Sequence, residues 1–251
     1  MLSGDNHIQK QFVKGNGLFI TGTDTGVGKT MVAGAIAQQL AERGRQVGVF
    51  KPIATGCRMT REGLVSTDAE FLAHCVDSPF SLDQINPIRY QEPLAPMVAV
   101  EQTGRQIDWE TLELAYNNIV DCSEVVIVEG IGGLMVPITR DYLVLDMMAD
   151  MNLPVVIVAR SQLGTINHTM LTIHACRQRK LQIAGIVING YRADCDDTAQ
   201  QSNPQVIQDI SGVPVLAVIP YDTDSCVERG VLADQVKAAA QLVSWEDLLA
   251  I

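Results

Sequence analysis

The stretch of sequence that decides the fold is GLFITGTDTGVGKT, residues 17–30. Its apolar half, Leu18–Thr21, predicts a buried strand, and a loop with glycines leads from it to Lys29 and Thr30. The following residues predict a helix that ends at Gly44, with apolar positions at Ala33, Ile36, Ala37 and Leu40. Strand, glycine-bearing loop, Lys-Thr and helix in this order are typical of a phosphate-binding loop, in which backbone N–H groups and a helix N-terminus hold the anion. The alternative is a strand–turn–helix connection that merely contains Gly-Lys-Thr.

Five further apolar runs predict the rest of a sheet: Val47–Phe50, Val125–Val128, Val155–Val158, Ile186–Ile188 and Val215–Ile219. They are continuous instead of alternating, as expected for strands covered on both faces, and helical patterns lie between them. The predicted fold is therefore α/β, a mostly parallel sheet with helices on both faces, like that of P-loop nucleoside triphosphatases. We predict an N-terminal extension over residues 1–15 and a single domain over residues 16–251, in which residues 192–204 form a polar surface excursion.

The composition argues against several classes of protein. Of the 251 residues 18 are basic and 29 acidic, so the formal net charge is −11, and such a surface repels nucleic acid and anionic lipid. No apolar run approaches the roughly 20 residues that cross a bilayer, and the N-terminus does not resemble a secretory signal. The six cysteines form no metal-binding motif, and His168 and His174 are six residues apart. We therefore expect a cytoplasmic protein with reduced thiols, no zinc site, and no nucleic-acid or membrane partner.

Three charged residues lie where a parallel sheet binds its ligands, beyond the carboxyl ends of the strands. Lys51 ends the second apolar run and can neutralise a transferring phosphoryl group; the alternative is an ordinary surface lysine. Glu129 follows Val125–Val128 and can hold Mg²⁺, or it caps the next turn. Asp68 lies in Ser66-Thr67-Asp68, which sequence alone favours as a helix cap.

The loop also departs from the strict phosphate-binding pattern. Gly22 is one residue early, which makes the motif G-x5-G-K-T. Asp24 occupies the position where partition-type ATPases carry a second lysine that acts on a neighbouring subunit's nucleotide.

At family level, the sequence resembles the dethiobiotin synthetases. The resemblance rests on GTDTGVGKT (22–30), Lys51-Pro52, VEGIGG (128–133), QLGTINH (162–168), GIVIN (185–189) and VIPY (218–221), in order from about residue 17 to 221. It implies ATP- and Mg²⁺-dependent closure of a ureido ring on 7,8-diaminononanoate with CO₂, a reaction of biotin synthesis. It implies three successive events: carbamate formation on one amine, transfer of the γ-phosphoryl group to the carbamate, and attack of the second amine with release of phosphate.

The resemblance also implies roles for individual residues. Lys29 and Lys51 would be catalytic, and Thr30, Asp68 and Glu129 would bind Mg²⁺. The nucleotide would be bound by Gly26, Val27, Gly28, Lys29, Thr30, Met31, Asp68, Glu129, Gly130, Gly132, Asn189, Gly190, Ile219, Pro220 and Tyr221. The diamine substrate would be bound by Thr25, Thr55, Gly164, Thr165, Ile166 and Asn167.

The implied site includes a second subunit. The helix start at Gly164–Asn167 would receive the substrate's carboxyl tail from a neighbouring subunit of a homodimer, although sequence alone favours simple capping by Thr165 or Asn167. Tyr191 is a candidate for a further carboxylate anchor. Gly26 stands where family members often carry an acidic residue, so that side-chain contact is missing here.

Two other functions are compatible with the loop. A cobyrinate-type amide synthetase would need a glutaminase domain with a cysteine nucleophile, for which we expect no room in this chain. A partition or targeting ATPase that acts on DNA or membrane is disfavoured by Asp24, by the acidity, and by the lack of a basic amphipathic tail.

Overall fold

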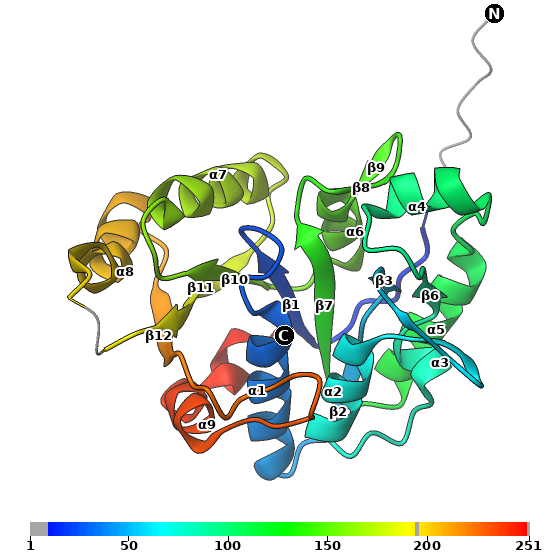
Figure 1. Ribbon diagram of the computed structural model, residues 1–251, viewed down its shortest axis with the longest axis horizontal. Helices are drawn as coiled ribbons and strands as arrows, with labels where there is room; N and C mark the ends of the chain where they lie inside the picture. Colours follow the sequence, from blue (N-terminus) through cyan, green and yellow to red (C-terminus); the bar gives the residue numbers. More distant parts are fainter. Residues whose placement is uncertain (1–9, 194–195, 250–251) are drawn as a thin grey trace, which may run out of the picture.

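The computed structural model describes residues 10–193 and 196–249. A six-stranded parallel sheet forms its centre, in the order β12-β11-β10-β1-β7-β2 (Figure 1). Its strands are β1 (Gly17–Gly22), β2 (Val47–Phe50), β7 (Val125–Gly133), β10 (Val155–Arg160), β11 (Ile183–Tyr191) and β12 (Val215–Pro220). The six predicted runs are therefore all strands of one sheet, and β7 and β11 extend beyond the predicted runs at their carboxyl ends.

Helices cover both faces of this sheet, because the strand residues alternate between two apolar cores. On β1, Leu18 and Ile20 face one core and Phe19 faces the other. The first core is covered by α1 (Lys29–Glu42), α2 (Thr67–Cys75), α3 (Leu82–Ile85), α9 (Asp234–Gln241) and the 3₁₀-helix η1 (Trp245–Leu248). The second is covered by α4 (Pro96–Thr103), α5 (Trp109–Asp121), α6 (Val144–Met151), α7 (Thr165–Gln178) and α8 (Thr198–Ser211).

Among the described residues, six short strands pair outside the central sheet: β3 (Ile53–Ala54) with β6 (Ile88–Arg89), β4 (Arg58–Thr60) with β5 (Gly63–Val65), and β8 (Pro137–Thr139) with β9 (Tyr142–Leu143). The first helix ends as predicted, with Gly44 at φ 85° and its N–H bonded to the Ala41 carbonyl at 2.8 Å. In the described part of the chain, none of the helices combines the length and the apolar character that crossing a membrane requires.

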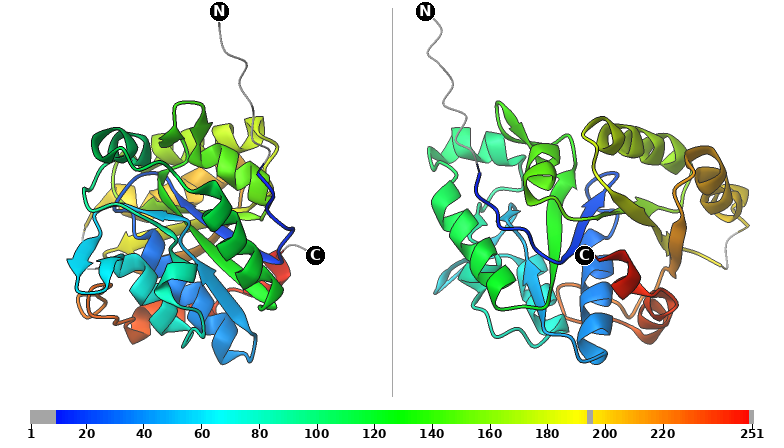
Figure 2. Two further views of the ribbon diagram at one scale, coloured as in Figure 1. Left: turned by 90° about the vertical axis from the view of Figure 1, so that its right-hand side faces the viewer. Right: turned by 180° about the vertical axis from the view of Figure 1, so that it is seen from behind.

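Residues 10–13 lie along α5, on the side seen from behind in Figure 2. The Asn117 amide accepts from Val13 N–H at 3.0 Å and donates to the Gln11 carbonyl at 3.0 Å. Phe12 packs edge-on against Tyr116, with ring centroids 5.3 Å apart. The part of the predicted extension before residue 10 lies outside the described residues, as does Cys195; the other five cysteines are free.

The prediction of a surface excursion over residues 192–204 is wrong for its second half. Helix α8 begins at Thr198, and Asp197 caps it by accepting the Ala199 N–H at 2.9 Å. Gln200 and Asn203 are buried despite their polarity, because their amides bond to groups at the end of β10 and in the chain that follows β11. Residues 194 and 195 of this segment lie outside the described residues.

Candidate functional site

The phosphate loop, residues 22–30, joins β1 to α1 and has the backbone geometry that binds an anion. Gly26 and Gly28 have φ of 74° and 92°, a region that favours glycine. A Cβ at Gly28 would lie 2.0 Å from the Asn189 Nδ2, so a larger residue cannot fit there. Gly28 is also the N-cap of α1 and no side chain caps this helix, which leaves its first N–H groups available to a phosphate.

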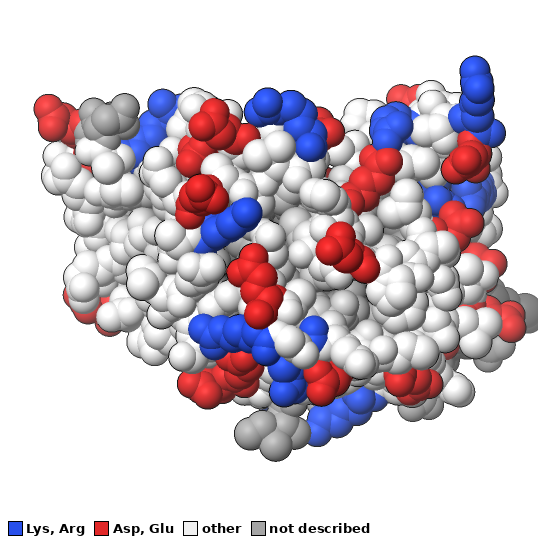
Figure 3. Space-filling view, turned by 90° about the horizontal axis from the view of Figure 1, so that it is seen from below, with Lys and Arg blue, Asp and Glu red and all other residues white. Residues whose placement is uncertain are grey.

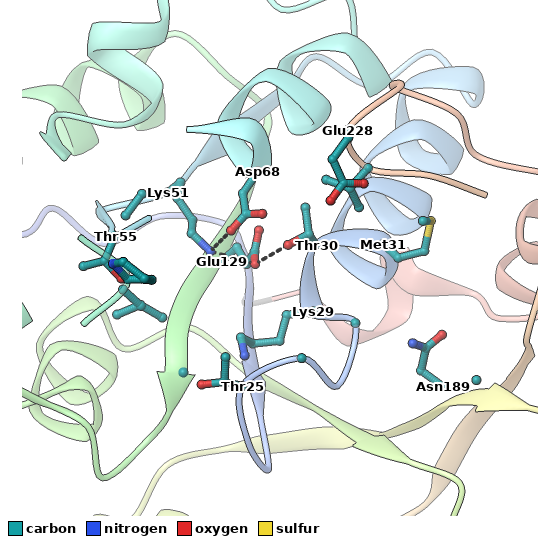
Figure 4. Close-up of a pocket in the computed structure, with 18 of the residues that line it drawn as sticks. Thr25, Lys29, Thr30, Met31, Lys51, Thr55, Asp68, Glu129, Asn189 and Glu228 are labelled. Atoms are coloured by element: carbon teal, nitrogen blue, oxygen red, sulfur yellow. Dashed lines mark hydrogen bonds and ion pairs between the residues drawn. The ribbon is translucent and has the colours of Figure 1, made fainter. Parts of the chain in front are cut away.

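The loop borders a cavity of about 750 Å³ (Figure 4). Fifteen of the residues expected at the site line it: Thr25, Gly26, Gly28, Lys29, Thr30, Met31, Lys51, Thr55, Asp68, Glu129, Gly132, Asn189, Gly190, Pro220 and Tyr221. They come from the ends of β1, β2, β3, β7, β11 and β12 and from α1 and α2, so the topology gathers segments far apart in the sequence at one edge of the sheet.

Lys51 is the centre of a charged cluster in this cavity. Its Nζ lies 2.8 Å from Glu129 Oε1 and 2.8 Å from Asp68 Oδ2, and it donates to the Gly130 carbonyl at 3.2 Å (Figure 4). Lys51 and Glu129 are only 3% and 1% exposed. Lys51 is therefore not a surface lysine, and Glu129 lies within β7 and caps no turn.

The backbone around Lys51 is held as firmly as its side chain. Its N–H donates to the Ile85 carbonyl at 2.8 Å, and its carbonyl accepts from the buried Asn86 amide at 2.6 Å. No sequence signal pointed to Asn86, because this residue lies in the irregular region between β2 and β7 and belongs to no motif.

The pKa values in this cluster follow from burial and from the two opposed charges. Burial works against the Lys51 ammonium, but Glu129 and Asp68 outweigh it and raise the pKa of Lys51. For Glu129, burial and the neighbouring Asp68 raise the pKa in spite of Lys51. Burial also opposes ionisation of Asp68, but Lys51 and Thr30 outweigh it, and the pKa of Asp68 is lowered. Lys29 lacks such a tight pair, and burial lowers its pKa to about 8.

Asp68 is available to Lys51 because another residue caps its helix. The N-cap of α2 is Ser66, whose Oγ accepts from Ala69 N–H at 3.4 Å. The prediction that Asp68 serves as the cap is wrong: it lies in the first turn and pairs with Lys51.

The oxygen atoms beside Lys51 fit a magnesium ion. The Thr30 hydroxyl donates to Glu129 Oε1 at 2.8 Å, and the second carboxylate oxygen of Glu129 is buried without a hydrogen-bond partner. Hydroxyl and carboxylate oxygens are the ligands that Mg²⁺ takes. The described residues contain no group of three His, Cys, Asp or Glu side chains placed to hold a metal alone, so an ion here would also need ligand oxygens such as those of phosphates.

The far end of the cavity is lined by the ends of β11 and β12. The Asn189 amide donates to the Val27 carbonyl at 2.9 Å, which ties β11 to the phosphate loop. Tyr221 is bonded through its N–H to the Tyr191 carbonyl at 2.7 Å, and the Arg192 guanidinium lies 3.9 Å from the Tyr221 ring centroid. Tyr191 itself is not among the lining residues.

Some expected residues lie away from this cavity. Val27 and Ile219 are buried in the core, and Gly130 contributes its carbonyl to Lys51 from within β7. Conversely, Glu228 and the segment 93–96 line the cavity although no sequence motif pointed to them.

The remaining candidates, Gly164, Thr165, Ile166 and Asn167, begin helix α7. Capping by Thr165 or Asn167 is wrong: the N-cap is Gly164 at φ 94°, and no side chain caps the helix. The Thr165 side chain is 1% exposed and its Oγ1 has no hydrogen-bond partner. Further along α7, His168 and Leu171 line a second cavity of about 480 Å³ that reaches Thr25 of the phosphate loop.

Comparisons with known proteins identify relatives over most of the chain. A family model described as "AAA domain" matches residues 16–229. The ATP-dependent dethiobiotin synthetase BioD of Thermodesulfovibrio yellowstonii is 40% identical over 216 residues, which cover 83% of this chain and 90% of the relative. The protein of the same name from Bacillus licheniformis is 42% identical over 211 residues, 83% of this chain and 87% of the relative.

Solved structures confirm the predicted fold, an α/β fold with a mostly parallel sheet like that of P-loop ATPases. The cell division ATPase MinD of Pyrococcus furiosus matches 91% of this chain and 96% of its own, with a TM-score of 0.53 and 20% identity. A ParA family ATPase from Chlorobium tepidum matches 92% of this chain and 98% of its own, with a TM-score of 0.57 and 14% identity. At such low identity these similarities concern the fold alone.

Proposed function

This chain belongs to the family of ATP-dependent dethiobiotin synthetases, and on that premise we propose that it joins CO₂ to 7,8-diaminononanoate and closes the ureido ring of dethiobiotin. ATP is the co-substrate, and the products are dethiobiotin, ADP and phosphate. The observation that carries this proposal is the position of Lys51, a buried ammonium at the wall of the cavity that the phosphate loop borders.

The proposed reaction has three steps. One amine of the substrate adds to CO₂ and loses a proton, which gives a carbamate. The γ-phosphoryl group of ATP then passes to a carbamate oxygen, and ADP is released. Finally, the second amine attacks the carbamate carbon of this mixed anhydride, loses a proton and expels phosphate, which closes the five-membered cyclic urea.

The residues of the site suit the transfer of a phosphoryl group. The loop amides and Lys29 bind the phosphates, and Lys51 stabilises negative charge on the carbamate and on the group in transit. Thr30, Asp68 and Glu129 would hold Mg²⁺, which would supply positive charge to stabilise the phosphates during transfer. Thr55, which also lines the cavity, contacts the diamine.

The end of the cavity near β11 and β12 is the proposed site of the adenine base. The Asn189 Nδ2 is engaged by the Val27 carbonyl. This contact uses one of its two N–H groups, so the second N–H can donate to adenine N7 while Oδ1 accepts from the exocyclic amino group. Gly190, Pro220 and Tyr221 form the surrounding wall.

We also propose a homodimer in which the start of α7 receives the carboxyl tail of a substrate bound to the neighbouring subunit. The uncapped helix N-terminus and the buried, unpartnered Thr165 hydroxyl suit a carboxylate. Apolar side chains nearby support an interface, since Leu163, Leu171 and Met135 are 85%, 60% and 61% exposed.

The surface charges support a cytoplasmic enzyme of small molecules without nucleic-acid or membrane partners. On the face seen from below in Figure 3, Lys and Arg side chains are interspersed with Asp and Glu. With a net charge of −11, such a surface offers little attraction to a phosphate backbone or an anionic bilayer.

The test of the function is a reconstituted reaction. The protein is incubated with Mg²⁺, ATP, ¹³C-bicarbonate and 7,8-diaminononanoate, and mass spectrometry follows the products, with the Lys51→Met variant as the control. We expect a labelled cyclic urea in proportion to ADP with the wild-type protein and none with the variant. ADP production that responds to DNA or liposomes and not to the diamine would contradict the proposal.

A further inference from the structure

Asp24 makes three polar contacts in the phosphate loop. Its Oδ2 pairs with Arg160 Nη2 at 2.8 Å, and its Oδ1 accepts from Thr25 N–H at 2.7 Å. Its main-chain carbonyl accepts from Lys29 Nζ at 3.0 Å. The orientation of this residue thus sets both the direction of the next peptide and the position of the lysine that meets the phosphates.

Arg160 has a counterpart on the neighbouring strand. Arg160 ends β10 and is the register partner of Asn189 on β11. Arg160 bonds to Asp24 near the start of the loop, and Asn189 bonds to the Val27 carbonyl near its end. Between these two points a Cβ at Gly26 would meet nothing within 4 Å. Arg160 and Asn189 therefore hold the loop at two points from the side of β10 and β11, and the turn at Gly26 between these points has no neighbour within 4 Å of such a Cβ.

Charge gives Arg160 a second role beside geometry. An unpaired Asp24 carboxylate in the loop would repel an incoming triphosphate. The deeper charges, Lys51 against Asp68 and Glu129, already neutralise one another in part and cannot compensate for it. Arg160 is the cation that pairs with the Asp24 carboxylate, whereas Lys29 bonds to the Asp24 main-chain carbonyl.

We propose that Arg160 is a positioning residue for nucleoside triphosphate binding, which acts through Asp24 by holding the phosphate loop open and by cancelling the charge of that carboxylate. The proposal rests on the proposed function, because it requires a triphosphate at this loop. Asp24 occupies the position where partition-type ATPases carry a second lysine, which acts on a neighbouring subunit's nucleotide. The proposal gives Asp24 a role in nucleotide binding within its own subunit.

A double-mutant cycle tests this proposal with the full-length protein. Mg²⁺-ATP binding is measured by calorimetry without diamine, and steady-state kinetics give KM for ATP, KM for diamine and kcat. The variants are Arg160→Ala, Asp24→Asn and the double variant. Asparagine keeps an oxygen that accepts from Thr25 N–H but removes the charge. Arg140→Ala is the matched control, since Arg140 pairs with Glu101 at 2.9 Å on the surface.

We expect Arg160→Ala to weaken ATP binding and raise KM for ATP about fivefold, with kcat and the diamine KM changed less than about twofold. In the Asp24→Asn background the same substitution should change ATP binding less than about twofold. Arg140→Ala should change none of these values, and melting temperatures verify that every variant is folded.

The outcomes separate the two proposals. If the wild-type protein binds no ATP, the proposed function fails. If it binds ATP but Arg160→Ala leaves the affinity unchanged, or weakens it equally with and without the Asp24 carboxylate, the role of Arg160 is wrong. A fall in kcat with unchanged ATP affinity would likewise refute it.

Discussion

Replacing Lys51 by methionine tests how strongly this site is held together. Methionine keeps most of the side-chain volume but removes the ammonium that lies 2.8 Å from both Glu129 and Asp68. Breaking a buried ion pair by removing one partner costs about 3–5 kcal/mol. The Asp68 side chain is 39% exposed, so water screens its share. We therefore expect the lower end, about 3 kcal/mol of unfolding free energy at pH 8, most of it from Glu129.

The pH dependence of this loss has a definite sign. The pKa of Glu129 is raised by burial even beside Lys51, and it rises further when Lys51 is removed. An acid with a raised folded-state pKa binds its proton more tightly in the folded protein. The stability of Lys51→Met should therefore fall as the pH rises from 5 to 8, by at most about 1.4 kcal/mol per pH unit. In the wild-type protein the raised pKa of Lys51 affects stability in a different pH range. Its contribution is full below 10.5 and is lost as the pH rises through the higher pKa of the folded state.

The assay is urea denaturation followed by circular dichroism at pH 5.5 and pH 8. The double variant Lys51→Met/Glu129→Gln replaces the pair by neutral groups and should recover about 2 kcal/mol at pH 8. Turnover should fall by orders of magnitude in both variants. The reasoning is refuted if Lys51→Met is within about 1 kcal/mol of wild type at pH 8, or if Glu129→Gln adds to the loss instead of offsetting it.

Three further predictions concern the phosphate loop. Because the pKa of Lys29 is about 8, its ammonium loses its proton between pH 7 and 9, so ADP affinity should decrease over this range and calorimetry should detect proton uptake on binding. Equal affinities at pH 7 and pH 9 would contradict this. Gly28→Ala should lose nucleotide binding and about 2–3 kcal/mol of stability in urea titrations, since its Cβ would lie 2.0 Å from the Asn189 side chain. Gly44→Ala places its Cβ in open space and should cost only about 1 kcal/mol, and similar losses in the two variants would exclude the Asn189 contact as the cause. Thr30→Ala should raise the Mg²⁺ concentration for half-maximal activity about tenfold while Thr30→Ser stays near wild type, and an unchanged magnesium titration would remove Thr30 from the ion's ligands.

The sequence was most informative where structure is local. The loop between Leu18–Thr21 and Lys29 requires glycines at fixed positions, and this requirement is visible in the motif itself. Buried parallel strands need continuous apolar residues, so the six runs identified the sheet. Lys51 and Glu129 could be expected at the ligand edge, because each ends or follows a run that had to be a strand.

The sequence was least informative where one polar group competes with another. Ser66, Thr67 and Asp68 are all good helix caps, and only the contact with Lys51 explains why Asp68 faces the site. Gln200 and Asn203 look like surface residues, because the carbonyls and hydroxyl that they bond to lie some forty residues away.

The sequence by itself determined a phosphate loop, a parallel α/β sheet and the charged residues at its edge, since each follows from patterns within about 15 residues. Only the tertiary structure decided that β7 lies between β1 and β2, which brings Glu129 between Thr30 and Lys51, and that Arg160 and Asn189 are neighbours beside the loop. Strand order and burial depend on how all the elements pack together, and burial is what couples the Lys51 ammonium tightly to the carboxylates of Asp68 and Glu129.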